Sequence, residues 1–83
     1  MNFNDEIREF VTKNFLFGDG GTLLNDDSFL EKGIVDSTGI LEVIAFIEKK
    51  YAINVDDSEL LPENLDSINN ISAFLMRKTA GKQ

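Results

Sequence analysis

The spacing of hydrophobic residues predicts two long amphipathic helices in this chain. From Asn4 to about Leu16, hydrophobic side chains recur every three or four positions and charged side chains fill the opposite face. This first set is Phe3, Ile7, Phe10, Val11 and Phe15. From Ser37 to about Tyr51, hydrophobic residues again form one stripe at helical spacing. The second set is Ile40, Val43, Ile44, Ile47 and Tyr51. Each helix is therefore expected to bury one face in a common core.

The segment between these helices is predicted to be a long loop that packs against the core. It starts in the glycine-rich stretch 17–21 and continues to Gly33. A loop of about 20 residues is unusual in a compact domain unless it packs or has a function. One helical turn is expected around Ser28 to Lys32. The hydrophobic residues that indicate packing are Phe29, Leu30, Ile34 and Val35.

The C-terminal part is predicted to contain one short helix and one long helix. The short helix starts either near Asp57 or with Pro62 at its first position, and the pattern leaves both starts open. The last helix is expected to begin at residues 66–67 and to end near Lys78, before a disordered tail of about 79–83. Its inward residues are predicted to be Ile68, Ile71, Phe74 and Leu75.

No segment shows the sustained period-two alternation of a strand. The predicted fold class is therefore all-α. We expect one domain over residues 1–83, a small four-helix bundle of three main helices and one short helix. The long loop lies between helices 1 and 2.

Charge restricts the classes of partner. The chain of 83 residues has a net charge of −7, so nucleic acids and anionic lipid surfaces would be repelled. Proteins with basic patches are the expected partners, and steering by opposite charge favours transient docking. No run approaches the roughly 18 apolar residues of a membrane span, and the N-terminus shows no secretory signal. A cytoplasmic monomer is the expectation.

Residue types for catalysis are scarce. The chain has no His and no Cys, so general acid-base or nucleophilic chemistry would depend on carboxylates alone. The pairs 26–27 and 56–57 are both Asp-Asp, but neither lies in a calcium-binding loop with a closing Glu. The glycine-rich stretch 18–21 lacks the Lys-Ser or Lys-Thr of a phosphate loop. We therefore expect no enzyme and no resident metal.

One dipeptide, Asp36-Ser37, places a hydroxyl beside a carboxylate at the start of the most apolar predicted helix. Taken alone, the pair is an ordinary helix N-cap. In context, the stretch from Gly33 to Glu42 resembles the Asp-Ser-Leu motif of the acyl carrier protein family. The similarity extends over nearly the whole chain, including the segment from Ile53 to Leu65 and the final amphipathic helix.

This resemblance implies a specific role for Ser37. In the family, a phosphopantetheinyl transferase uses coenzyme A and magnesium to attach 4'-phosphopantetheine to the motif serine. The terminal thiol of that arm then holds acyl or aminoacyl groups as thioesters for loading and transfer enzymes with basic patches. Asp36 matches the aspartate that meets the transferase. The residues implied in partner binding are Thr38, Leu41, Glu42, Ala45 and Glu48, with Leu41 and Ala45 as an apolar strip between the acids.

Two positions depart from the family pattern. Thr38 stands where the motif usually has Leu, and Gly39 stands where an acidic residue is common. These departures favour a specialised carrier over the general fatty-acid carrier. The residues considered for setting the depth of a cargo-sheltering interior are Phe29, Phe46, Phe74 and Ile71, which otherwise form plain core.

Two other classes of protein remain open from the sequence. One is an acidic helical adaptor that docks through Leu41 and Ala45, with Asp36-Ser37 acting only as a helix cap. The other is a small regulatory protein that binds a divalent ion through its Asp pairs.

Overall fold

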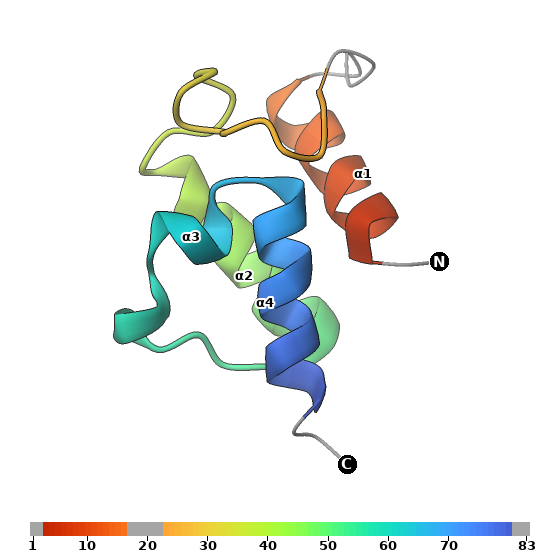
Figure 1. Cartoon of the computed structure of the whole chain (residues 1–83), viewed down its shortest axis with the longest axis vertical. Coiled ribbons are helices and arrows are strands. Elements are labelled where there is room, and N and C mark those ends of the chain that lie inside the picture. The colour runs from red at the N-terminus through yellow and green to blue at the C-terminus, as the bar shows by residue number, and fades with distance from the viewer. Residues whose placement is uncertain (1–2, 17–22, 81–83) are drawn as a thin grey trace.

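The computed structural model describes residues 3–16 and 23–80, and the regular elements of these residues are all helical (Figure 1). Three helices have 13 residues each: α1 (Phe3–Phe15), α2 (Gly39–Tyr51) and α4 (Ile68–Ala80). Between α2 and α4 lie a 3-10 turn, η2 (Asp57–Glu59), and a short helix, α3 (Pro62–Leu65). The described residues contain no strand. The all-α prediction of three main helices and one short one is confirmed.

Helix α4 packs against both α1 and α3. All four of its predicted inward residues are buried, which confirms the face assigned from the sequence. The helical part of the core also contains Val43 and Ile47 of α2, Ile7 and Val11 of α1, and Leu65 of α3. Burial of these apolar side chains, at about 1.5–3 kcal/mol each, is the main force that holds the helices together.

The described part of the long connection packs as predicted. Phe29 and Val35 are fully buried, and Leu23 is nearly so. The expected helical turn forms, since the Lys32 N–H donates to the Ser28 carbonyl oxygen at 3.0 Å. Gly33 follows this turn with a φ of 69°, a backbone conformation that side chains disfavour. One prediction for this segment is wrong: Leu30 is 49% exposed.

Asp66 fastens this connection to the start of α4. Its carbonyl oxygen accepts from Phe29 N at 2.7 Å, and its Oδ1 accepts from Leu30 N at 3.0 Å. The Ser28 hydroxyl donates to the other oxygen of the same carboxylate. These bonds fix the segment that leads into α2 beside the corner between α3 and α4.

Several predicted boundaries need correction. Helix α2 begins at Gly39 and not at Ser37, and α4 continues through Ala80, so Thr79 and Ala80 are helical. Residues 81–83 and the glycine-rich stretch 18–21 lie outside the described residues. Both starts considered for the short helix are used, because η2 begins at Asp57 and α3 begins with Pro62 at its first position.

Among the helices that the structure describes, none has the length and apolar character needed to cross a membrane.

Candidate functional site

Asp36 forms the cap at the start of α2. Its Oδ1 accepts a hydrogen bond from Gly39 N at 2.6 Å, and its carbonyl oxygen accepts from Ile40 N at 2.9 Å. This pairing satisfies amide groups that a helix start otherwise leaves unpaired. The cap is therefore Asp36 alone. The prediction that Ser37 contributes to the cap is wrong.

Ser37 is exposed, and its hydroxyl makes no hydrogen bond with any described residue. The neighbouring Asp36 and Thr38 are exposed as well. Because Asp36 performs the capping, the serine oxygen is open to another molecule.

An apolar groove of about 150 Å³ begins at Ser37 and separates α2 from the segment that holds η2 and α3. Its lining residues are Leu30, Ser37, Ile40, Leu41, Ile44, Leu60, Leu61, Pro62, Leu65 and Asp66. Of the six large hydrophobic residues that are exposed in the described chain, four line this groove. Such gathering of exposed apolar side chains marks a binding surface more often than chance scatter does.

The sequence analysis did not identify the side of the groove opposite α2. This side, called the far wall below, is formed by Leu60, Leu61, Pro62 and Leu65. A local signal was present, because two adjacent leucines, Leu60 and Leu61, stand directly before Pro62, which begins a short helix. Both are more than 40% exposed and both line the groove.

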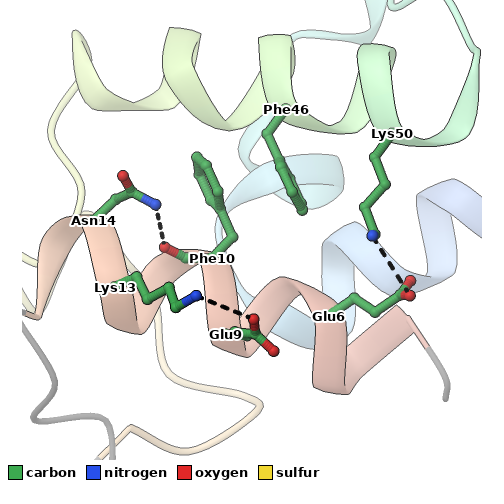
Figure 2. Close-up of a pocket in the computed structure, with 7 residues that line it drawn as sticks. All are labelled: Glu6, Glu9, Phe10, Lys13, Asn14, Phe46 and Lys50. Carbon is green, nitrogen blue, oxygen red and sulfur yellow. Dashed lines mark hydrogen bonds and ion pairs between the residues drawn. The ribbon is translucent and has the colours of Figure 1, made fainter.

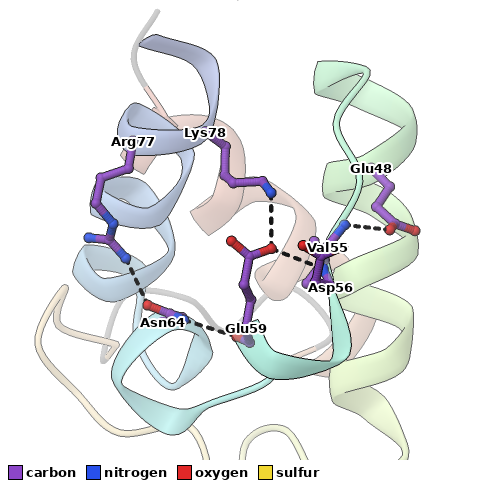
Figure 3. A network of polar contacts seen from close by, with 7 residues as sticks. All are labelled: Glu48, Val55, Asp56, Glu59, Asn64, Arg77 and Lys78. Atoms are coloured by element: carbon purple, nitrogen blue, oxygen red, sulfur yellow. Dashed lines mark hydrogen bonds and ion pairs between the residues drawn. The ribbon is translucent and has the colours of Figure 1, made fainter. Parts of the chain in front are cut away.

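Polar contacts hold this far wall to α4 (Figure 3). Glu59 Oε1 accepts from Asp56 N at 2.9 Å and pairs with Lys78 Nζ at 2.9 Å. These contacts, the backbone N–H first, lower the pKa of Glu59. Asn64 Nδ2 donates to the Glu59 carbonyl oxygen at 2.9 Å, and Arg77 donates to Asn64 Oδ1 at 2.7 Å. The wall is thus attached to α4 by the ion pair of Glu59 with Lys78 and by the hydrogen bond of Arg77 with Asn64.

The acidic residues expected to meet partners differ in their surroundings. Glu42 is exposed and makes no ion pair with described residues, and Leu41 and Ala45 are exposed on the same helix. Glu48 is half-buried, and its Oε2 accepts from Val55 N at 2.9 Å (Figure 3). Unlike Glu42, Glu48 therefore has a structural role, because its carboxylate holds the chain that leaves α2.

Gly39 is buried for a packing reason. A Cβ atom at this position would lie 2.8 Å from Phe15 Cε1 and 3.1 Å from Val35 Cγ1. The end of α1 therefore packs directly against the backbone of α2. This contact explains the glycine without reference to any partner, which the sequence interpretation did not foresee.

The residues considered for the depth of a cargo cavity do not line the Ser37 groove. Phe29, Ile71 and Phe74 are core residues with at most 2% exposure. Phe46 stacks on Phe10 with ring centroids 4.1 Å apart, in the hollow between α1 and α2 (Figure 2). Their role as plain core or helix packing is the one that the contacts support.

Three of the four residues in the Asp pairs have structural contacts. Asp27 Oδ2 accepts from Leu24 N at 2.9 Å, Asn69 donates to Asp26, and Asp56 is the cap of η2. Within residues 3–16 and 23–80, no group of three or more acidic side chains is arranged to hold a metal ion.

Comparison of the chain with models of known protein families gives no match, and comparison with curated protein sequences gives no relative.

Proposed function

We propose that this protein is an acyl carrier protein in which Ser37 is the attachment site for 4'-phosphopantetheine. The observation that carries the proposal is the position of the serine. Its hydroxyl is exposed, makes no hydrogen bond within the described chain, and lies at the edge of an apolar groove. The resemblance of the stretch from Gly33 to Glu42 to the motif of the carrier family supports the same residue.

The surroundings of Ser37 suit a phosphodiester. A phosphate on its oxygen would lie at the N-terminal end of α2, where the helix dipole favours an anion. In the transfer, the serine oxygen forms a new bond to phosphorus as the bond to the nucleotide part of coenzyme A breaks. Asp36 Oδ1 accepts a hydrogen bond from Gly39 N, and the second oxygen of the carboxylate is available for the transferase. When bound, the group supplies a thiol that holds an acyl or aminoacyl cargo as a thioester.

The groove gives an attached arm an apolar surface beside its point of attachment. Ile40 and Ile44 form the α2 side and are half-buried, while Leu61 on the opposite side is 42% exposed. Covering such surface is favourable by about 25 cal/mol per Å². A short apolar length of arm or cargo would be stabilised there.

Recognition by partner enzymes is assigned to the exposed face of α2. Leu41 and Ala45 supply an apolar strip, and Glu42 together with the net charge of −7 favours enzymes with basic patches. Thr38 offers a smaller and more polar contact next to Ser37 than the leucine usual in the family. This difference supports a specialised carrier. The protein itself catalyses no step in this proposal.

An acidic adaptor is the competing function, and one observation favours it: Leu41 is 59% exposed on a helix that Asp36 caps without any help from Ser37. Incubation with coenzyme A, Mg²⁺ and a broad-specificity phosphopantetheinyl transferase separates the two. We expect the intact mass to rise by one phosphopantetheine group. An adaptor or an ion-binding protein would keep its original mass.

A further inference from the structure

Asp66 joins two segments that line the Ser37 groove. Its backbone N–H donates to the Pro62 carbonyl oxygen at 2.9 Å and ends α3, and its Oδ1 accepts from Leu30 N at 3.0 Å. Leu30, Pro62 and Asp66 all line the groove. One residue therefore sets the spacing between the connection that carries Leu30 and the far wall.

The carboxylate of Asp66 can line an apolar groove because both of its oxygens have donors from the protein. Oδ1 accepts from Leu30 N, and the other oxygen accepts from the Ser28 hydroxyl. A carboxylate paired in this way costs less to cover with an apolar group than an unpaired one does. The side chain is thus directed at the connection and not at a ligand.

Leu30 is held through both of its backbone groups. Its N–H donates to Asp66, and its carbonyl oxygen accepts from Gly33 N at 3.2 Å. The preceding residue, Phe29, is fully buried and anchors the turn in the core. The exposed side chain of Leu30 therefore lies at the groove on a fixed backbone, and its bulk narrows the groove.

We propose that Leu30 and Asp66 determine which apolar groups the Ser37 groove accepts. Leu30 is the residue that limits the width, and Asp66 is a positioning residue that holds Leu30 at a fixed distance from the far wall. The groove has a volume of about 150 Å³, so a slender unbranched alkyl group fits it better than a branched isomer. The α2 side does not yield, because Val43 and Ile47 fix that helix in the core.

This inference rests on the proposed function in taking the arm on Ser37, or its cargo, as the natural ligand of the groove. It adds a preference for unbranched apolar groups and names the residues that set it. The geometry of Leu30 and Asp66 does not itself depend on modification of the serine.

The test is an NMR titration of the unmodified ¹⁵N-labelled protein with two neutral isomers, 1-hexanol and 3,3-dimethyl-1-butanol. We expect saturable shifts at the amides of Ile40, Leu41 and Leu61. The affinity for 1-hexanol should be about three- to five-fold higher, the effect of roughly one methylene group in contact. Leu30→Ala widens the groove and should make the two affinities equal.

Two variants of Asp66 separate positioning from stability. Asp66→Ala removes the side-chain acceptor of Leu30 N but leaves the backbone bonds of residue 66, and it should abolish the preference. Asp66→Asn retains an acceptor oxygen for Leu30 N and should restore most of the preference. A purely stabilising role would lower the unfolding temperature without changing the ratio of the two affinities in the folded protein.

Leu24 and Asp27 form a matched control pair in the same connection. Asp27 Oδ2 accepts from Leu24 N at 2.9 Å, and Leu24 is 65% exposed, but neither residue lines the groove. Leu24→Ala and Asp27→Ala should therefore retain the native preference. Because Leu30 is exposed, Leu30→Ala keeps the test informative even if Asp66→Ala unfolds the protein.

Equal affinities in the native protein, or an unchanged preference in Leu30→Ala or in folded Asp66→Ala, would overturn the inference. The titration is repeated on Ser37→Ala, so that its outcome is independent of the transferase reaction. A preference for 1-hexanol without any mass gain in that reaction would retain the role of Leu30 and Asp66 and reject the carrier function. A mass gain without the preference would do the reverse.

Discussion

The ring of Phe15 fills the space that a side chain on Gly39 would need, since a Cβ there would lie 2.8 Å from Phe15 Cε1. This contact joins the last residue of α1 to the first residue of α2. The two positions lie on either side of the long connection, so they are coupled in space and not in sequence.

We predict that Gly39→Ala destabilises the protein and that Phe15→Ala reduces this destabilisation. In the native background, crowding against the ring costs about 1–3 kcal/mol, which exceeds the gain of up to about 1 kcal/mol in helix preference. With Phe15 removed, a Cβ at position 39 still lies 3.1 Å from Val35 Cγ1 and 3.2 Å from Asp36 Oδ1, so part of the crowding remains. Urea denaturation of the two single variants and the double variant measures this coupling. Additive effects of the two substitutions would show that the contact is not tight.

A second prediction concerns the cap of α2. Asp36→Ala should lower the free energy of unfolding by about 0.5–2 kcal/mol, because Gly39 N loses its acceptor. Ser37→Ala should stay within about 0.5 kcal/mol of the native protein, since the hydroxyl makes no bond in the described chain. Chemical denaturation of both variants under one buffer condition checks the pair. A larger loss for Ser37→Ala than for Asp36→Ala would reverse the assignment of the cap.

The two glutamates of α2 should respond differently to charge reversal. Glu48→Lys removes the acceptor of Val55 N and should cost about 0.5–1.5 kcal/mol. Glu42→Lys should leave stability nearly unchanged but slow the reaction with a basic partner enzyme and weaken its dependence on salt. Thermal unfolding and transferase kinetics at several salt concentrations separate the two roles. Equal destabilisation by both variants would contradict the different environments of these side chains.

Acid should loosen the wall of the Ser37 groove through Glu59. The pKa of this carboxyl is lowered in the folded protein by the N–H of Asp56 and by Lys78. Its contribution to stability is therefore complete above the unfolded pKa, near 4.5, and is lost as the pH falls through the lower folded value. Thermal unfolding from about pH 6 downward should show a smaller acid loss for Glu59→Gln than for the native protein.

The exposed neighbour Glu63 gives the control for this measurement. Glu63→Gln should retain the native dependence of unfolding temperature on pH. If Glu59→Gln also retained it, the contacts of Glu59 with Asp56 and Lys78 would not contribute to acid stability.

The sequence was sufficient for the features that depend on local periodicity. The inward residues of α4 and the stripe of α2 follow from helical spacing, and the structure confirms α4 residue by residue. Both starts proposed for the short helix exist, because Asp57 and Pro62 each begin a separate turn. The start at Asp57 and the start at Pro62 are therefore both correct, although the sequence presented them as alternatives for one helix.

Contacts between distant segments could not be inferred in the same way. The packing of Phe15 on Gly39 and the bond from Val55 to Glu48 depend on how segments meet, which no local pattern specifies. The exposure of Leu30 has the same origin, because its position beside the groove is set by Asp66 at the start of α4. Candidate site residues on α2 were therefore found from sequence, while the opposite wall of the groove was not.

The most direct measurement of the central claim is the intact mass of the native protein, Ser37→Ala and Ser58→Ala after reaction with coenzyme A and a broad-specificity transferase. Ser58 is the matched control, since it is exposed and follows an aspartate in η2. The carrier assignment predicts one added phosphopantetheine on the native protein and on Ser58→Ala, and none on Ser37→Ala. An unmodified native protein, or a Ser37→Ala variant that still gains the group, would contradict it.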